Sequence, residues 1–442
     1  MVLHAFSAAG VGVCVALAAG APQAEAPREW VLLGRIKQQM AQNLSRLPDY
    51  TCLETIERST RPGGSGSFQR LDLLRVEVAQ VGSKELFAWP GARRFEEKSL
   101  GEMVGVGAIG TGDFALHARS VFRSSVPTFR YLGEQELNGR RTLGYEYRVT
   151  RFNSGYIVHT SGGQATVPYR GSFWVDAGTL ELLRLDVQAD EIPPELGISS
   201  VATQIHYGST RIGPSDFLLP QSAEVLLTLP SGAAKRNRIE FTHCRQYSTE
   251  AVVSFGPPAE EQPVAGAGAG GKRITEIELP AGLSLVTALE TEIDSEKSAV
   301  GDLIQARVLK DVKQQDRLMV PRGAMLTGRI RSLGRHPDYP EYFVVGLEFS
   351  EVEFGNSRGR FLAQMENRQA FPGATRQLSF SRTTVSGTVL GDGRSETTRN
   401  TTRTTVELPG VGLFFIEASR VRLPRGFRLV WRTTEPGPSQ KP

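Results

Sequence analysis

A succession of short segments in which apolar and polar side chains alternate is the feature that most constrains how this chain folds. Residues 129–137 and 141–150 alternate in this way on either side of Asn138 and Gly139, a dipeptide typical of two-residue β-hairpins. Further alternating segments, each bounded by turn residues, lie at 171–175, 180–187, 200–211, 221–229 and 238–246. Because alternation with a period of two marks a half-buried strand, the sequence predicts a mostly antiparallel β-sheet.

An amphipathic helix is predicted before these strands. Its apolar residues recur at steps of three or four and are followed by Pro48; they are Trp30, Leu33, Ile36, Met40, Leu44 and Leu47. This spacing places them on one face of a helix, which would cover the sheet. A second, shorter helix is predicted over residues 113–122.

Composition and size narrow the class of protein. The 442 residues exceed one compact core, so we expect two domains. The 47 Gly and 25 Pro predict many turns, and the 40% hydrophobic content excludes both wholesale disorder and a polytopic membrane protein. A formal net charge of +4 is too small to indicate a nucleic-acid partner.

The N-terminal residues predict export. Residues 1–24 contain no Asp, Glu, Lys or Arg, and residues 8–21 are small and apolar, which is typical of a signal peptide. The alternative is an uncleaved N-terminal anchor, although the run is shorter than the roughly 20 strongly apolar residues of a membrane-spanning helix.

Two cysteines remain after this segment, Cys52 and Cys244, and both lie in strand-like sequence. Because exported chains mature in an oxidising compartment, we predict that they form a disulfide. This disulfide would tie the first strand of a domain to its last. The alternative is two unrelated buried thiols.

The chain divides at a Gly-, Pro- and Ala-rich segment, residues 255–273, which has no periodicity and predicts a flexible linker. The predicted domains are residues 27–254 and 274–436. In the second, the pattern Pro-x-Gly precedes an alternating strand three times, at Pro280, Pro321 and Pro424, and predicts tight turns into strands of a β-barrel or sandwich. The Thr-rich residues 383–405 predict a disordered loop.

The first domain resembles a known superfamily. The leading helix, the hairpin at Asn138 and Gly139, and the run Phe173-Trp174-Val175-Asp176 followed by residues 182–185 resemble the periplasmic lipoprotein carriers, which are outer-membrane lipoprotein-sorting proteins and their relatives. The resemblance covers residues 27–250. It implies an open, curved antiparallel half-barrel whose apolar concave face is closed by helices and holds acyl chains.

The resemblance also implies a ligand and a compartment. The residues that would line an apolar groove are Trp30, Leu33, Ile36, Met40 and Trp174. Their ligand would be a lipid or lipoprotein acyl chain. The protein would reside in the periplasm or on the periplasmic face of the outer membrane.

A second resemblance concerns residues 279–330. This stretch contains Ile293-Asp294-Ser295 and Val320-Pro321-Arg322-Gly323 and resembles the C-terminal β-barrel of conjugation-type secretion channel subunits. The resemblance implies a barrel here. Similar modules occur in envelope proteins that have no channel role.

No complete catalytic, cofactor or metal motif is present in the sequence. Residues 105–110 spell a dinucleotide fingerprint, but no parallel βαβ unit surrounds it, and the six histidines lack the spacing of a metal site. The acidic run Asp186, Asp190, Glu191 and Glu195 is interpreted as solvated strand ends rather than as an acid–base pair or a calcium site. We therefore predict a non-enzymatic protein without catalytic, cofactor or metal residues.

Charge is divided unevenly within the second domain. Residues 276–354 hold 9 Lys and Arg against 14 Asp and Glu, a net of −5, whereas residues 355–442 hold 14 against 6, a net of +8. The basic segment 355–442 could contact an envelope protein partner or an anionic envelope polymer. The alternative is that its arginines pair with the acidic half.

Two hypotheses for function follow. In the first, an exported envelope protein binds a lipid or another apolar ligand in its half-barrel. In the second, the chain is a structural or docking component of an envelope assembly and uses both domains as protein-binding surfaces. A deep groove beneath the N-terminal helix would favour the first, and a filled core would favour the second.

Overall fold

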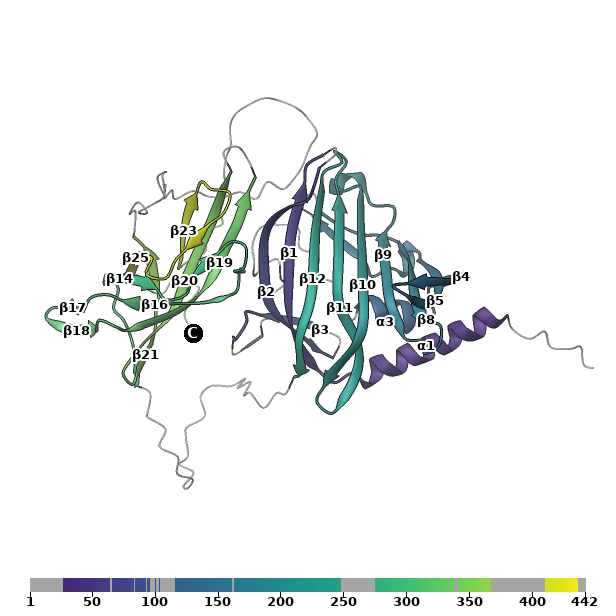
Figure 1. The fold of residues 1–442 in the computed structure, drawn as a ribbon, viewed down its shortest axis with the longest axis horizontal. Coiled ribbons are helices and arrows are strands. Elements are labelled where there is room, and N and C mark those ends of the chain that lie inside the picture. Colours follow the sequence, from purple (N-terminus) through teal and green to yellow (C-terminus); the bar gives the residue numbers. More distant parts are fainter. Residues whose placement is uncertain are drawn as a thin grey trace, which may run out of the picture.

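The computed structural model describes residues 27–63, 66–82, 84–92, 94–95, 100, 103, 116–160, 163–247, 275–337, 341–366 and 410–435. The predicted signal peptide, linker and Thr-rich loop lie outside these residues. Two β-sheets dominate the described part of the chain and lie side by side, with β2 (Gln69–Val81) and β19 (Met325–His336) facing each other (Figure 1).

The first sheet has ten strands in the order β3-β2-β1-β12-β11-β10-β9-β8-β5-β4, and all neighbours are antiparallel. Besides β2, its strands are β1 (Tyr50–Arg61), β3 (Lys84–Ala88), β4 (Thr128–Leu137), β5 (Arg140–Val149), β8 (Tyr169–Asp176), β9 (Leu182–Ala189), β10 (Ser200–Ile212), β11 (Ser215–Thr228) and β12 (Ala234–Gln246). The sheet curls into a half-barrel, which confirms the predicted fold class. A separate hairpin, β6 (Ile157–Thr160) and β7 (Gly163–Thr166), follows β5.

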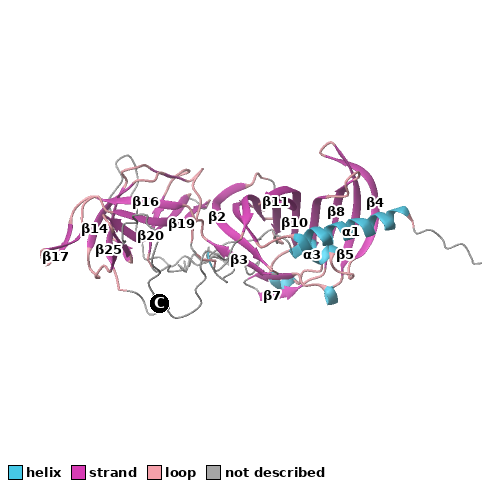
Figure 2. Cartoon of the chain, turned by 90° about the horizontal axis from the view of Figure 1, so that it is seen from below, coloured by secondary structure: helices cyan, strands magenta, loops and turns pink. Residues whose placement is uncertain are grey.

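The predicted N-terminal helix is α1 (Arg28–Arg46), which ends two residues before Pro48. It buries Leu33, Ile36, Met40 and Leu44, which belong to the predicted apolar face. A shorter helix, α3 (Leu116–Phe122), lies beside it, and the curved sheet wraps around both (Figure 2). No helix in the described ranges is both long and apolar enough to cross a bilayer.

The second sheet has nine strands, with the order β13-β21-β20-β19-β16-β14-β25-β22 and β23 paired to β20. Besides β19, they are β13 (Thr275–Ile277), β14 (Ser284–Leu289), β16 (Leu303–Val308), β20 (Tyr342–Phe354), β21 (Ser357–Arg360), β22 (Ala363–Met365), β23 (Val411–Ile416) and β25 (Arg428–Thr433). Short pairs join β15 (Ile293–Asp294) to β24 (Arg422–Leu423) and β17 (Val312–Gln314) to β18 (Arg317–Val320). Trp431 of β25 is fully buried, with the rings of Phe349 and Phe361 edge-on to it.

The three Pro-x-Gly sequences form the predicted turns. Gly282, Gly323 and Gly426 have φ angles of 91°, 91° and 85°, a region that glycine enters without steric cost. Each turn leads into a strand, β14, β19 or β25, and each glycine N–H donates to a carbonyl on a neighbouring segment. The repeated Pro-x-Gly motif therefore forms the turn that precedes three strands of this sheet.

The predicted disulfide between Cys52 and Cys244 is present. It joins β1 to β12, the first and last of the long strands of the half-barrel along the chain, which are neighbours inside the sheet and not at its edge. The ladder between these strands shifts register between Thr51 and Leu53, next to the disulfide. The disulfide therefore links the two ends of the half-barrel segment of the chain, where the first and last long strands pair.

Candidate functional site

The concave face of the half-barrel, beneath α1, is where the sequence predicts an apolar groove. Leu33, Ile36 and Met40 point to this face and are buried in one apolar cluster with side chains of the sheet. Under the helices, the rings of Tyr145 and Phe173 stack with centroids 5.3 Å apart, and Phe122 of α3 lies edge-on to Phe173 at 4.9 Å. In the described residues this face is therefore a packed core.

The two tryptophans predicted to line the groove lie elsewhere. Trp30 is half exposed, with 50% of its surface accessible. Trp174 faces away from the core, because its neighbours Phe173 and Val175 take the inward positions of β8. The Arg184 guanidinium lies over the Trp174 ring at 4.7 Å, so the groove assignment of Trp174 is wrong.

Helix α1 is fixed to the sheet by polar contacts at several points. The Asn43 side chain donates to the Leu218 carbonyl and accepts from the Leu218 N–H, at 3.1 and 3.2 Å. The Tyr145 hydroxyl donates to the Glu29 carbonyl at 2.8 Å, and Lys37 donates to the Ser124 carbonyl at 3.0 Å. Release of α1 from the concave face would break these bonds and expose its apolar stripe.

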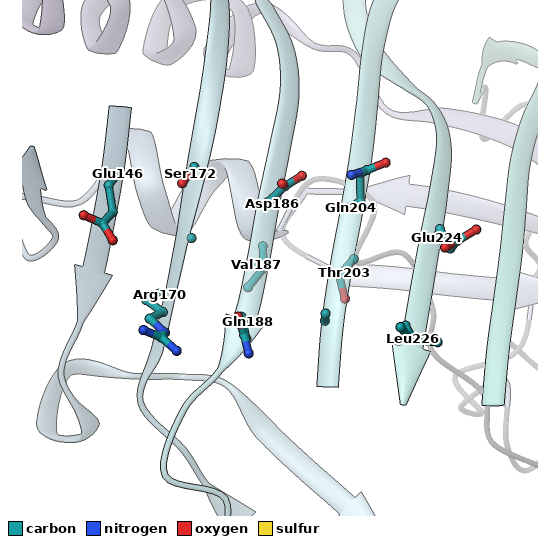
Figure 3. A pocket seen from close by; sticks show the side chains of 12 residues that line it. Glu146, Arg170, Ser172, Asp186, Val187, Gln188, Thr203, Gln204, Glu224 and Leu226 are labelled. Carbon is teal, nitrogen blue, oxygen red and sulfur yellow. The ribbon is translucent and has the colours of Figure 1, made fainter. Parts of the chain in front are cut away.

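A hollow of about 460 Å³ lies on the opposite, convex face of the same sheet (Figure 3). Five adjacent strands, β5 and β8 to β11, contribute to it, and small residues such as Ser172 and Ala202 lie between longer ones. Its carboxylates are Glu146, Asp186 and Glu224. The lining is rich in charged, amide and hydroxyl groups, so the hollow is suited to hydrogen bonding rather than to an acyl chain.

Each carboxylate of the hollow has an arginine partner. Arg130 donates to Glu146 at 2.8 Å, Arg184 to Asp186 at 2.7 Å, and Arg238 to Glu224 at 3.1 Å. These three carboxylates are therefore engaged in ion pairs at the surface of the hollow.

A row of polar side chains continues from the hollow across β9 and β10. Gln204 lies between Arg184 and His206, with its side-chain amide 3.1 Å from Nε2 of His206. Burial lowers the pKa of His206 below its usual 6.5, and the positive charge of Arg184 lowers it further; Asp186 acts weakly in the opposite direction. His206 is therefore neutral at physiological pH.

This row yields a pH prediction. Because the pKa of His206 is lower in the folded than in the unfolded chain, the unfolded chain takes up a proton first as pH falls below about 6.5. His206 should thus reduce stability progressively as pH falls through that range. NMR titration should give a midpoint below 6.5, and Arg184→Gln should raise it. An unchanged midpoint in Arg184→Gln would exclude the electrostatic contribution of Arg184.

A backbone contact between β2 and the segment around Val300 joins the two sheets. The short β3 pairs only with residues 77–81 of β2, which leaves Leu73, Leu74 and Arg75 at the sheet edge. Val300 occupies this edge as a parallel bridge: its N–H donates to the Leu73 carbonyl and its carbonyl accepts from the Arg75 N–H, both at 2.8 Å. We call the contacts of Leu73 and Arg75 with residues 299–302 the edge clamp.

Side chains reinforce the edge clamp. Both Asp302 oxygens lie 2.7 Å from the Arg75 guanidinium. Arg329 of β19 donates to the Pro90 carbonyl at 2.7 Å and to the Gly301 carbonyl at 3.1 Å. Gly301 has φ of 101°, and a Cβ there would clash with the Arg75 carbonyl, so only glycine fits this approach.

Four described arginines of the predicted basic segment form ion pairs within the second domain. Arg420 pairs with Asp294, Arg422 with Glu292, and Arg358 and Arg432 with Glu353 and Glu366. Three of these partners belong to the acidic half, residues 276–354. Of the seven arginines described in residues 355–442, three thus pair with that half.

Comparisons with known proteins identify no family. No family model matches the chain, and no curated protein does. Several solved structures are similar, among them the following two. One is an outer membrane lipoprotein-sorting protein domain from Vibrio parahaemolyticus, with 13% identity over 48% of this chain and 90% of that one, and a TM-score of 0.29. The other is a DUF1329 family protein from Desulfovibrio piger, with 12% identity over 50% and 95% of the two chains, and a TM-score of 0.27.

Proposed function

We propose that this chain is a non-enzymatic docking component of a bacterial cell envelope, in which the half-barrel and the second sheet act as one unit. The observation that carries the proposal is the edge clamp, which joins the two sheets by backbone hydrogen bonds. The Cys52–Cys244 disulfide supports an envelope location, because such bonds persist in oxidising compartments.

The edge clamp suits docking for a physical reason. An unpaired strand edge can pair with another chain, and proteins usually cover it. Here residues 299–302 cover the β2 edge, and Arg329 holds the adjoining loop at Pro90. A partner that contacts both sheets would meet a preformed surface. Binding would then cost little conformational entropy, because the two sheets are already held in place.

The Arg75–Asp302 pair tests whether the clamp holds the sheets together. Arg75→Asp or Asp302→Arg alone should place like charges together and raise the hydrogen-exchange rate of the Val300 and Arg75 amides by about tenfold or more. The double variant Arg75→Asp/Asp302→Arg restores opposite charges and should recover most of the protection. Equal exchange in the wild type and both single variants would contradict the clamp.

Docking itself can be tested by photo-crosslinking in cells. A photoreactive residue at Leu132 on β4 or at Leu318 on β18, both exposed, should capture the same discrete partner. In the Asp302→Arg variant, which should remain folded, the photoreactive residue at one of these two positions should no longer capture the partner. Absence of a discrete partner from both positions would refute the docking function.

Binding of an apolar ligand is the second candidate function. One observation favours it: the apolar stripe of α1 lies directly on the concave face of the sheet, so displacement of α1 would open an apolar surface. Native mass spectrometry of the purified protein and titration with a fluorescent fatty acid distinguish the candidates. A docking component should carry no lipid and take up no probe, whereas stoichiometric uptake would favour the carrier.

A further inference from the structure

The loop after β5 presents a phenyl ring to solvent. Phe152 is 97% exposed, whereas no other large hydrophobic side chain in the described residues exceeds 50%. Exposure of a whole phenyl ring to water forgoes the free energy that its burial would give. Ile157, at the start of the next hairpin, is 46% exposed and adds apolar surface five residues later.

Hydrogen bonds hold this loop in shape. The 3₁₀ turn η1 (Arg151–Asn153) is closed by bonds from the Asn153 N–H to the Thr150 carbonyl and from the Ser154 N–H to the Arg151 carbonyl. The Ser154 hydroxyl donates to the Val167 carbonyl at 2.6 Å. Phe152 is therefore held outward by a bonded frame, which fixes its position before any contact is made.

Three arginines lie in or close to the loop. Arg148, Arg151 and Arg170 are each more than half exposed and lie 3.4 to 4.0 Å from Asp190 or Glu191. Exposed pairs at these distances are weak, so the guanidinium groups can exchange partners readily. Three cations against two carboxylates leave a local excess of positive charge beside Phe152.

We propose that the loop of residues 150–155 docks on an anionic phospholipid bilayer, with Phe152 inserted at the interface and the three arginines at the headgroups. The inference rests on the proposed envelope location. A protruding ring needs a pocket of matching shape on a protein, whereas a bilayer accepts it without one. One apolar anchor is marginal by itself and becomes effective together with basic residues.

Vesicle flotation with the full chain tests the proposal. Wild-type protein should bind vesicles of phosphatidylglycerol and phosphatidylcholine, and more weakly pure phosphatidylcholine. Phe152→Asp should weaken binding by about tenfold to a hundredfold, because burial of the ring is lost and a charge is added. The matched control Leu318→Asp changes an exposed apolar residue of the separate β17–β18 hairpin and should bind vesicles like the wild type.

A depth measurement excludes binding by other parts of the chain. Phe152→Trp should show fluorescence quenched by brominated lipids beyond that of the wild type, which has four tryptophans. Equal vesicle binding by wild type and Phe152→Asp, or no binding by either, would overturn the proposal. If Phe152→Asp instead abolishes the crosslinked partner and leaves vesicle binding intact, the loop docks on protein. The crosslinking test reads out capture of a protein partner at Leu132 or Leu318 and not vesicle binding, so failure of membrane docking leaves the proposed function separately testable.

Discussion

Reduction of the Cys52–Cys244 disulfide should lower the free energy of unfolding of the half-barrel by several kcal/mol. The two cysteines are 192 residues apart in sequence, for which the chain-entropy model gives a ceiling of roughly 5 kcal/mol. The loss should be visible as a lower urea midpoint by circular dichroism after treatment with dithiothreitol.

A double variant separates the cross-link from the chemistry of the thiols. Cys52→Ala/Cys244→Ala should match the reduced wild type in stability and should not respond to dithiothreitol. Cys52 is buried, so alanine is a better replacement than serine, which would bring a hydroxyl into the core. An unchanged urea midpoint after reduction would contradict the prediction, because it would show that the disulfide does not stabilise the fold.

Asp72→Ala should be the most destabilising single substitution of a charged residue in the half-barrel. Asp72 accepts two bonds from Arg58, at 2.7 and 2.5 Å, and the two side chains are only 7% and 11% exposed. Burial alone would lower the pKa of Arg58, but the charge and hydrogen bonds of Asp72 outweigh it and raise the pKa. Loss of Asp72 leaves the guanidinium buried without its carboxylate, at a cost of about 3–5 kcal/mol.

The same site contains a second cation that sharpens this prediction. The pKa of Lys235 is lowered by burial and by the neighbouring charge of Arg58, so removal of Asp72 would leave two like charges close together. Replacement of both partners, Arg58→Met/Asp72→Leu, should cost far less because no buried charge is left. A urea midpoint for Asp72→Ala within error of the wild type would refute the role of the pair.

Local signals explain which parts of the fold could be predicted. The spacing of Leu33, Ile36 and Met40 and the position of Pro48 were sufficient for α1, and Asn138 with Gly139 was sufficient for the hairpin of β4 and β5. The Pro-x-Gly turns were predictable for the same reason, since they depend on backbone preferences of adjacent residues. The strand-like sequence around both cysteines, together with the expectation of export, was also sufficient to predict the disulfide.

Features that depend on tertiary contacts were not accessible from the sequence. In the continuous run of Phe173, Trp174 and Val175, alternation cannot tell which residue faces the core, and Trp174 proved to face outward. The edge clamp joins Arg75 to Asp302, 227 residues apart, and has no local signature. The convex hollow likewise arises from five strands and from the small size of Ser172 and Ala202.

The pairing of β1 with β12 determines how the half-barrel would bear a pulling force. The chain enters this sheet at the start of β1 and leaves it at the end of β12, and Tyr50 pairs with Gln246, so both points lie at the same end of the ladder. Tension between them acts to unzip the ladder pair by pair. The Cys52–Cys244 bond crosses between the same strands close to the pulled ends, so it stops their separation after the first pairs. A molecule that bridges envelope layers would resist mechanical extension by this arrangement.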